Sequence, residues 1–277
     1  MSLVEVTTAR GVAEVTLNRP EKLNAMNAEM LEEFDAVMAA LKSDPDVSCV
    51  LLRASGRAFS VGYDILGPRW GSNSIYQDWA RLSTNTERWI ELWDFPKPIV
   101  TAVQGYCFTV AMFFVFCTDV TVAADDAVFA IARAPISGAG WFTPIATLAL
   151  GMKKGRELTM ARGSQITGAE ASTLGLVNYA VPADDLLAKA RELAASISHT
   201  PLELLTLNKR AANRAMERLG YREALTAGIE FNTLSHFSNG AADVRAKVKE
   251  LGIKGAIEWW DAGGTLEPGF GTQSEEH

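Results

Sequence analysis

Short apolar runs of strand length alternate with stretches of helical periodicity along the first half of this chain. The run from Val12 to Leu17 alternates around Glu14 and Thr16 as a strand does, and Asn27 can cap the helix that follows it. Further strands are predicted at 47–53, 99–103, 120–124 and 128–131, with helices at 76–93 and 109–117. Because repeated strand–helix units require parallel strand pairing, the pattern predicts an α/β fold.

The periodicity changes after Pro201, where apolar residues recur at helical spacing and the other faces are charged. This change divides the chain into a predicted strand–helix core at 1–199 and a helical region at 200–262. The final segment, 263–277, is rich in glycine and acidic residues and is expected to fray. With 277 residues and 48% hydrophobic content, the chain can bury a sizeable core.

Charge and cysteine content exclude several classes of partner. The net charge is −7 and the lysines and arginines are scattered, which argues against a nucleic-acid-binding surface. The longest apolar run, 110–117, is far too short to span a bilayer, so no membrane association is expected. The three cysteines, Cys49, Cys107 and Cys117, lie in apolar runs without CxxC spacing, which fits a soluble protein of the reducing cytoplasm.

Two loops that each follow a predicted strand carry the main functional signal. The loop 58–64 (AFSVGYD) follows the apolar run 49–52, and the loop 104–110 (QGYCFTV) follows the strand 99–103. Two strand ends of this kind can present backbone N–H groups to one carbonyl oxygen. Fixed N–H donors at such a point stabilise the enolate of a thioester.

Several segments, taken together and in order, resemble the crotonase (enoyl-CoA hydratase/isomerase) superfamily. They are LNRPEKLNA at 17–25, the loop 57–64, PKP at 96–98, and GAEA with LGLV at 168–171 and 174–177. The resemblance runs from about Val4 to Phe237. It implies a crotonase-like spiral of strand–helix units, with C-terminal helices that close over the active site and build a homotrimer or a dimer of trimers.

The resemblance assigns the two oxyanion-hole donors to the backbone N–H groups of Tyr63 and Val110. An ordinary turn glycine is the alternative for Gly62, and a helix cap the alternative for Asp64. The family has a Gly-Gly pair where this chain has Thr109 and Val110, so the branched valine side chain is expected to narrow the slot for the thioester.

The acid and base groups of the family's hydratases are expected to be missing. Those enzymes use two glutamates, and the matching positions here are Phe113 and Arg133. The position where other members carry an aspartate matches Trp141. No histidine precedes His199, and both His199 and His236 lie in the late helical region, so neither a Ser-His-Asp triad nor a histidine metal site is predicted.

Four acidic residues near the expected pocket remain as candidates: Asp64, Asp78, Glu87 and Glu91. For each, a solvated helix face or a cap is the favoured interpretation. Asp78 is the residual catalytic candidate, because its aromatic neighbours Tyr76 and Trp79 could desolvate it and raise its pKa.

The substrate contacts follow from the same resemblance. Trp70, Tyr76 and Trp141 could line an acyl pocket, while Trp89 and Trp93 are expected to pack in the core or at a subunit contact. Arg133 would attract an acyl carboxylate or stabilise an enolate. Coenzyme A, expected only as part of the substrate, would pass the side chains that the family motif places along its path: Lys22, Ala25, Arg57, Ala58 and Ile65.

The resemblance therefore predicts an acyl-CoA enzyme that works through an enolate, with very slow hydration of simple enoyl-CoA substrates. A thioester hydrolase, decarboxylase or isomerase with a displaced acid or base is one alternative. A non-catalytic acyl-CoA-binding or assembly subunit is another, since a fold does not determine a function.

Overall fold

The computed structural model describes residues 2–64, 74–131 and 139–265. Its main sheet has six strands in the order β1-β2-β3-β4-β6-β9. All neighbours in this sheet pair in parallel except β1 and β2, which form a hairpin through Arg10 and Gly11. The prediction of parallel strand–helix units is confirmed. The strands are β1 (Val4–Ala9), β2 (Val12–Leu17), β3 (Cys49–Ala54), β4 (Ile99–Val103), β6 (Val120–Ala124) and β9 (Tyr179–Val181).

A second, smaller sheet follows the order β5-β7-β8. Strand β5 (Tyr106–Phe108) pairs in parallel with β7 (Val128–Ala130), and β8 (Ile166–Thr167) pairs with β7 in the antiparallel sense. Only two residues separate the end of β4 from the start of β5, so the smaller sheet fixes the loop that precedes Val110.

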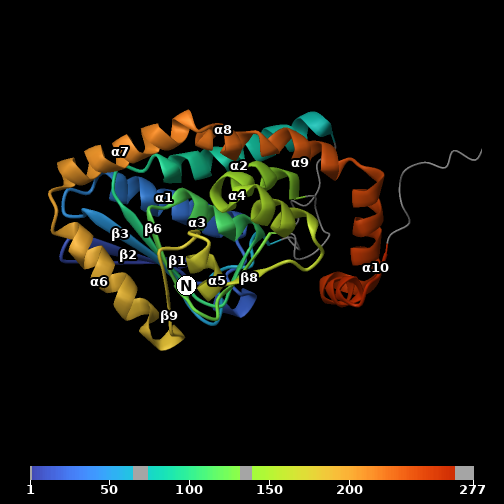
Figure 1. The fold of residues 1–277 in the computed structure, drawn as a ribbon, viewed down its shortest axis with the longest axis horizontal. Helices are drawn as coiled ribbons and strands as arrows, with labels where there is room; N and C mark the ends of the chain where they lie inside the picture. The colour runs from blue at the N-terminus through green and yellow to red at the C-terminus, as the bar shows by residue number, and fades with distance from the viewer. Residues whose placement is uncertain (1, 65–73, 132–138, 266–277) are drawn as a thin grey trace, which may run out of the picture.

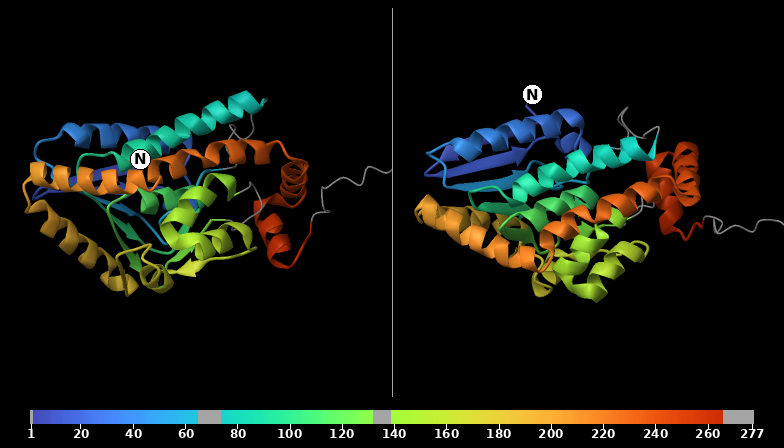
Figure 2. Two further views of the ribbon diagram at one scale, coloured as in Figure 1. Left: turned by 45° about the horizontal axis from the view of Figure 1, so that its top comes forward. Right: turned by 90° about the horizontal axis from the view of Figure 1, so that it is seen from above.

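Helices cover both faces of the main sheet (Figures 1 and 2). Helix α6 (Leu186–Ser198) packs on one face, against β3, β4 and β6. On the other side lie α1 (Ala28–Ser43), α2 (Ile75–Trp93) and the wholly buried α3 (Met112–Cys117). The Asn27 side chain accepts the Met30 N–H, as predicted, whereas the helix predicted at 109–117 begins with a separate 3-10 turn, Thr109–Ala111. The remaining helices before residue 200 are α4 (Thr143–Met160) and α5 (Gly168–Thr173).

The chain after residue 200 forms a row of helices that runs beside α2 (Figure 2). The row contains α7 (Leu202–Arg218), α8 (Tyr221–Thr226) and α9 (Gly228–His236). Helix α10 (Asn239–Asp261) stands at the far end and bends at Gly252, whose φ is 70°. No helix in these described ranges is long and apolar enough to cross a membrane.

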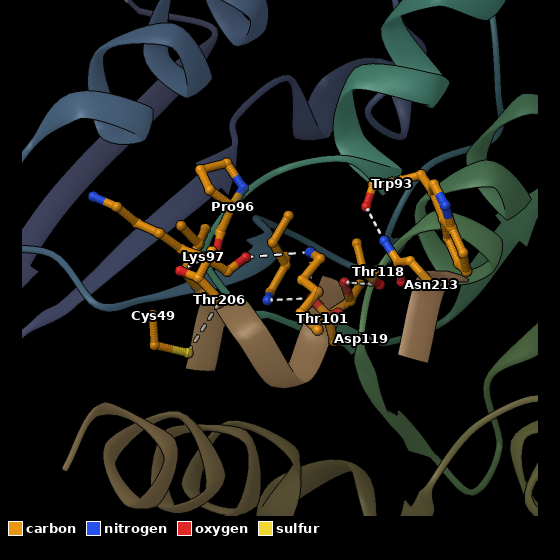
Figure 3. A network of polar contacts seen from close by, with 12 residues as sticks. Cys49, Trp93, Pro96, Lys97, Thr101, Thr118, Asp119, Thr206 and Asn213 are labelled. Carbon is orange, nitrogen blue, oxygen red and sulfur yellow. Dashed lines mark hydrogen bonds and ion pairs between the residues drawn. The ribbon is translucent and has the colours of Figure 1, made fainter. Parts of the chain in front are cut away.

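One face of α7 is joined to the strand–helix core by polar contacts (Figure 3). Thr206 Oγ1 donates to the carbonyl of Pro96 at 2.9 Å, and Asn213 Nδ2 donates to the carbonyl of Trp93 at 2.9 Å. Between them, the buried Lys209 places its Nζ 2.7 Å from Asp119 Oδ2. Residues 206, 209 and 213 share a helix face, so α7 docks in one register.

Aromatic side chains fill the space between α2 and α3. Trp89 is fully buried and stacks on Phe113 with ring centroids 5.3 Å apart, and Trp93 stacks on Tyr221 at 4.4 Å. Trp89 and Trp93 were expected either in the core or at a subunit contact, and in the described chain both pack in the core.

Candidate active site

Backbone pairing brings the two predicted oxyanion loops side by side. The Phe59 N–H donates to the Gln104 carbonyl at 2.8 Å, and the Ser60 N–H donates to the Tyr106 carbonyl at 3.0 Å. The Phe108 N–H returns a bond to the Ser60 carbonyl at 3.0 Å. These bonds run along both loops up to the residues just before Tyr63 and Val110.

Close approach of the loops explains the glycine at position 62. Gly62 has a φ of 94°, and a Cβ there would overlap Thr109 Oγ1. A side chain at 62 would therefore push the two loops apart. The alternative that Gly62 is an ordinary turn residue leaves this contact unexplained.

The N–H groups of Tyr63 and Val110 have no acceptor within the residues that the structure describes. The Met26 N–H donates to the Gly62 carbonyl at 2.8 Å, and the Asp64 N–H donates to the Met26 carbonyl at 2.9 Å. The N–H of Tyr63, which lies between these two bonds, therefore points away from Met26. Val110 lies in the first turn of the 3-10 segment, where N–H groups lack a partner within the helix. Both donors are thus available to an oxygen between the loops.

Thr109 has a φ of 51°, in the left-handed region. A β-branched residue adopts this conformation only under strain, whereas glycine adopts it freely. The Val110 side chain beside it is buried, with 5% of its surface exposed. The second loop therefore keeps a backbone shape suited to glycine while carrying two branched side chains.

Ring contacts connect three of the predicted site residues, Tyr63, Phe113 and Trp141. Phe113 is fully buried and its ring lies 5.1 Å from that of Trp141, which in turn lies 6.3 Å from the ring of Tyr63. Phe142 also packs on Phe113 at 5.1 Å. The side chain at position 113 is thus part of an apolar stack.

Asp78 differs from its predicted setting. It is 2% exposed and faces inward from the first turn of α2, while Tyr76 and Trp79 are 73% and 43% exposed. These two aromatic residues do not shield Asp78, and Tyr76 is largely exposed in the part of the chain that the structure describes. The interpretation of position 78 as a solvated face or cap was also wrong, because tertiary packing buries this side of α2.

Two basic side chains hold Asp78. Arg81 Nη2 lies 2.6 Å from Oδ1, and His236 Nδ1 lies 2.7 Å from Oδ2. Burial raises the pKa of Asp78, but the hydrogen bonds from Arg81 and His236 outweigh it, so the pKa is lowered and the predicted rise was wrong. His236 was missed because 158 residues separate it from Asp78.

The other acidic candidates lie in ordinary environments. Glu87 and Glu91 are exposed on α2. Asp64 Oδ2 accepts a bond of 2.7 Å from Arg19 Nη1, which also donates to the Ala25 carbonyl at 2.9 Å. Asp64 therefore braces the first oxyanion loop against the segment 17–25.

The residues predicted to meet coenzyme A come together where they are described. The Asn24 amide donates to the carbonyls of Ser55 and Ala58, each at 2.8 Å, which joins the loop of Lys22 and Ala25 to that of Arg57 and Ala58. Both basic side chains are exposed and both alanines are buried. Three further predicted contacts lie outside the described residues: Ile65, Trp70 and Arg133.

Comparison with known proteins agrees with this arrangement. The family model for enoyl-CoA hydratase/isomerase matches residues 7–245. A Mycobacterium bovis protein named as a probable enoyl-CoA hydratase is 34% identical over 209 residues, covering 74% of this chain and 79% of that protein. Hydroxycinnamoyl-CoA hydratase-lyase from Pseudomonas fluorescens is 29% identical over 230 residues, covering 78% of each.

Solved structures show the same fold. The crystal structure of a putative enoyl-CoA hydratase/isomerase from Novosphingobium aromaticivorans matches with a TM-score of 0.88 and 31% identity, covering 93% of this chain and 94% of that one. The match extends over both the sheets and the C-terminal helices, and the family model spans most of the sequence. The chain belongs to the enoyl-CoA hydratase/isomerase family.

Proposed function

We propose that this protein binds an acyl-CoA thioester and stabilises its enolate at the backbone N–H groups of Tyr63 and Val110. The observation that carries the proposal is the pairing of the two loops, which leaves these N–H groups without an acceptor in the described chain. Two fixed donors aimed at a developing negative charge lower the barrier to removing the proton next to the carbonyl. The exposed Lys22 and Arg57 would meet the phosphates of coenzyme A.

We assign proton transfer to His236, positioned by Asp78. With Nδ1–H donating to the Asp78 carboxylate, Nε2 carries the lone pair that can accept a proton. In this structure the Asn232 amide nitrogen lies 3.4 Å from Nε2, so a substrate proton would replace a weak hydrogen bond. The contact of helix α9 with the turn of Trp141 supports this assignment: a Cβ on Gly228 would overlap the Trp141 backbone, so the helix lies directly on that turn. The positions that match the family's glutamates hold Phe113 and Arg133, so fast hydration is not expected.

A non-catalytic acyl-CoA-binding role is the second candidate. It is favoured by the strained Thr109 and by Phe113, which fills its position with an aromatic stack in place of a carboxylate. Such a protein would bind the thioester without activating the adjacent carbon.

Exchange of the substrate's α-proton with solvent distinguishes the enzyme from the non-catalytic binding protein. Butyryl-CoA binding is measured by calorimetry, and loss of its α-proton signal in D2O is followed by NMR. The enzyme proposal expects binding together with exchange above the protein-free rate, while turnover of crotonyl-CoA stays far below about ten per second. Binding without exchange would favour the second candidate, and no binding would refute both.

The role of His236 is tested separately. His236→Gln should slow exchange by roughly a hundredfold or more without changing the affinity for butyryl-CoA. The exposed His199, at the end of α6, provides the matched control, and His199→Gln should change neither quantity.

We also propose that the protein assembles as a homotrimer or a dimer of trimers in the reducing cytoplasm. Its three cysteines are free and buried. Large apolar side chains are exposed along the C-terminal helices, which a subunit contact would cover.

A further inference from the structure

Around the phenol of Tyr63, four buried side-chain atoms that can donate have no hydrogen bond of good geometry within the described residues. They are Tyr63 Oη, Arg88 Nη1, Trp89 Nε1 and Trp141 Nε1, and we refer to them as the donor cluster. Trp89 is fully buried and Trp141 is 2% exposed, so surface water does not satisfy their indole N–H groups. Buried donors without a partner are rare in folded proteins.

Ring contacts place the cluster beside the proposed oxyanion hole. The rings of Tyr63 and Trp141 lie 6.3 Å apart, and Phe113 lies 5.1 Å from Trp141 and 5.3 Å from Trp89. Tyr63 thus contributes its backbone N–H to the proposed oxyanion hole and its hydroxyl to the donor cluster.

Charge effects on Tyr63 agree with this placement. Burial raises the pKa of Tyr63 to about 12, while the positive charge of Arg88 and a hydrogen bond from the Trp89 indole to the phenol oxygen oppose the rise. That bond is too poorly aligned to satisfy either group fully. The basic group and the indole therefore both lie close to the phenol.

The orientation of Arg88 is held from outside the cluster. Asp35 on α1 accepts two bonds from its guanidinium, at 2.6 and 2.7 Å, through Nε and Nη2. This pair fixes the plane of the guanidinium and leaves Nη1 directed elsewhere, buried and without a partner. The charge of Arg88 is balanced by Asp35, but the Nη1 hydrogens are not used.

We infer that the donor cluster binds an oxygen acceptor carried by the acyl group, such as a carbonyl or carboxylate oxygen beyond the thioester. The arginine and both indoles can only donate, and Tyr63 Oη is the one acceptor among the four. Its two lone pairs cannot satisfy three donors, so a wholly aliphatic acyl chain would leave at least one buried donor without an acceptor. An oxygen on the substrate would supply the missing acceptor. This inference rests on the proposed function and names the class of acyl group.

The test compares acyl-CoA ligands of equal chain length by calorimetry. Butyryl-CoA is the aliphatic reference, acetoacetyl-CoA adds a ketone and succinyl-CoA adds a carboxylate. At least one of the oxygen-bearing ligands should bind about tenfold or more tightly than butyryl-CoA. Which of them is preferred identifies the acceptor.

The variant Trp89→Phe tests whether the donors cause the preference. It removes one donor, keeps an aromatic ring and changes no residue of the proposed oxyanion hole. It should reduce the preference by about fivefold to tenfold and leave butyryl-CoA affinity unchanged. Trp93 is the matched control, because its buried indole N–H is also unpartnered but its ring stacks on Tyr221. Trp93→Phe should leave the preference unchanged.

Several outcomes would overturn the inference. Equal affinity for all three ligands in the unsubstituted protein would do so while leaving the proposed function intact. A loss of affinity in Trp89→Phe that is the same for aliphatic and oxygen-bearing ligands would show a packing role instead. Absence of binding by every acyl-CoA would refute the proposed function, and the inference with it.

Discussion

At the scale of single residues, Thr109 and Val110 distinguish the second oxyanion loop from the glycine pair expected there. Thr109 has a left-handed backbone conformation. The buried side chain of Val110 lies next to its own N–H, which would donate a hydrogen bond to the thioester oxygen. The donor is therefore retained while the space around it is reduced.

Replacing Val110 tests this crowding. Val110→Gly keeps the N–H and removes the branched side chain, so we expect tighter binding of butyryl-CoA, by about tenfold, in calorimetry. Val110→Ile is the matched control, since it keeps the N–H and enlarges the side chain, and it should weaken binding. Weaker binding by the glycine variant with an unchanged fold would contradict the crowding.

The ion pair between Glu14 and Arg191 should make the free energy of unfolding depend on pH. Its carboxylate accepts two bonds from Arg191, at 2.8 and 2.9 Å, which join β2 to α6. The hydrogen bonds from Arg191 lower the pKa of Glu14, against the opposing effect of burial. Because the folded-state pKa lies below the unfolded value of about 4.3, the stabilisation is complete above that value and is lost as the pH falls through the folded-state pKa.

Unfolding by urea from pH 7 to pH 3 measures this effect. Glu14→Gln should be less stable than the unsubstituted protein near neutral pH, and the difference should shrink below about pH 4. Glu258 on α10 is largely exposed and lies 3.7 Å from Lys254, so Glu258→Gln is the control and should show no such trend. A constant difference for the Glu14 variant at every pH would contradict the assignment.

At the scale of elements, α7 is fixed to the core by a buried ion pair within a row of polar contacts. Lys209 Nζ contacts Asp119 Oδ2 and also lies 3.2 Å from the carbonyl of Lys97. Lys97, itself buried, reaches the carbonyl of Leu41 at 2.6 Å, so the network connects α7 to the end of α1. Helix α9 follows from α7, so its position over Trp141 depends on this docking.

We expect Lys209→Met to lower the free energy of unfolding by about 2 kcal/mol, because it removes hydrogen bonds to a charged group and leaves Asp119 without its cation. For a chain of 277 residues the loss corresponds to a fall in Tm of roughly 3–4 °C. Lys254, 92% exposed at its side chain, is the control, and Lys254→Met should change Tm by less than about 1 °C. Equal shifts for the two variants would contradict the docking role.

At the scale of the whole molecule, the C-terminal helices have two different surfaces. One packs on the core through Lys209 and Tyr221, and the other exposes large apolar side chains. The exposed set in the described residues consists of Leu204, Leu207, Leu219, Phe231, Leu234, Phe237 and Leu251. An apolar surface of this kind favours association of identical chains.

Light scattering should therefore give three or six times the 30.0 kDa mass of one chain at micromolar concentration. Leu207 is 61% exposed, and Leu207→Glu should reduce the mass if this surface is the contact. Glu29→Gln, on an exposed position of α1, should leave it unchanged. A stable single chain before any substitution would contradict the assembly.

Local pattern was enough to predict most of the fold. The strands at 12–17, 99–103 and 120–124 have the predicted bounds, because alternation and apolar runs are properties of neighbouring residues. The 3-10 turn at Thr109–Ala111 was not foreseen, since it begins at a left-handed Thr109 that lies where the second loop approaches Gly62, a contact between distant segments. The strand–loop positions of Tyr63 and Val110 could likewise be located from the sequence, through their family motif.

The sequence by itself determined the strand–helix order, the family and the loops that carry the proposed oxyanion hole, because each depends on residues close together in the chain. Only the tertiary structure decided which side of α2 is buried. That choice placed Asp78 against His236 and exposed Tyr76. It also brought Tyr63, Trp89 and Trp141 together in the donor cluster. These contacts join segments up to 158 residues apart. They depend on how α2, α9 and the turn before α4 pack on one another, and the spacing of neighbouring residues in the sequence does not predict that packing.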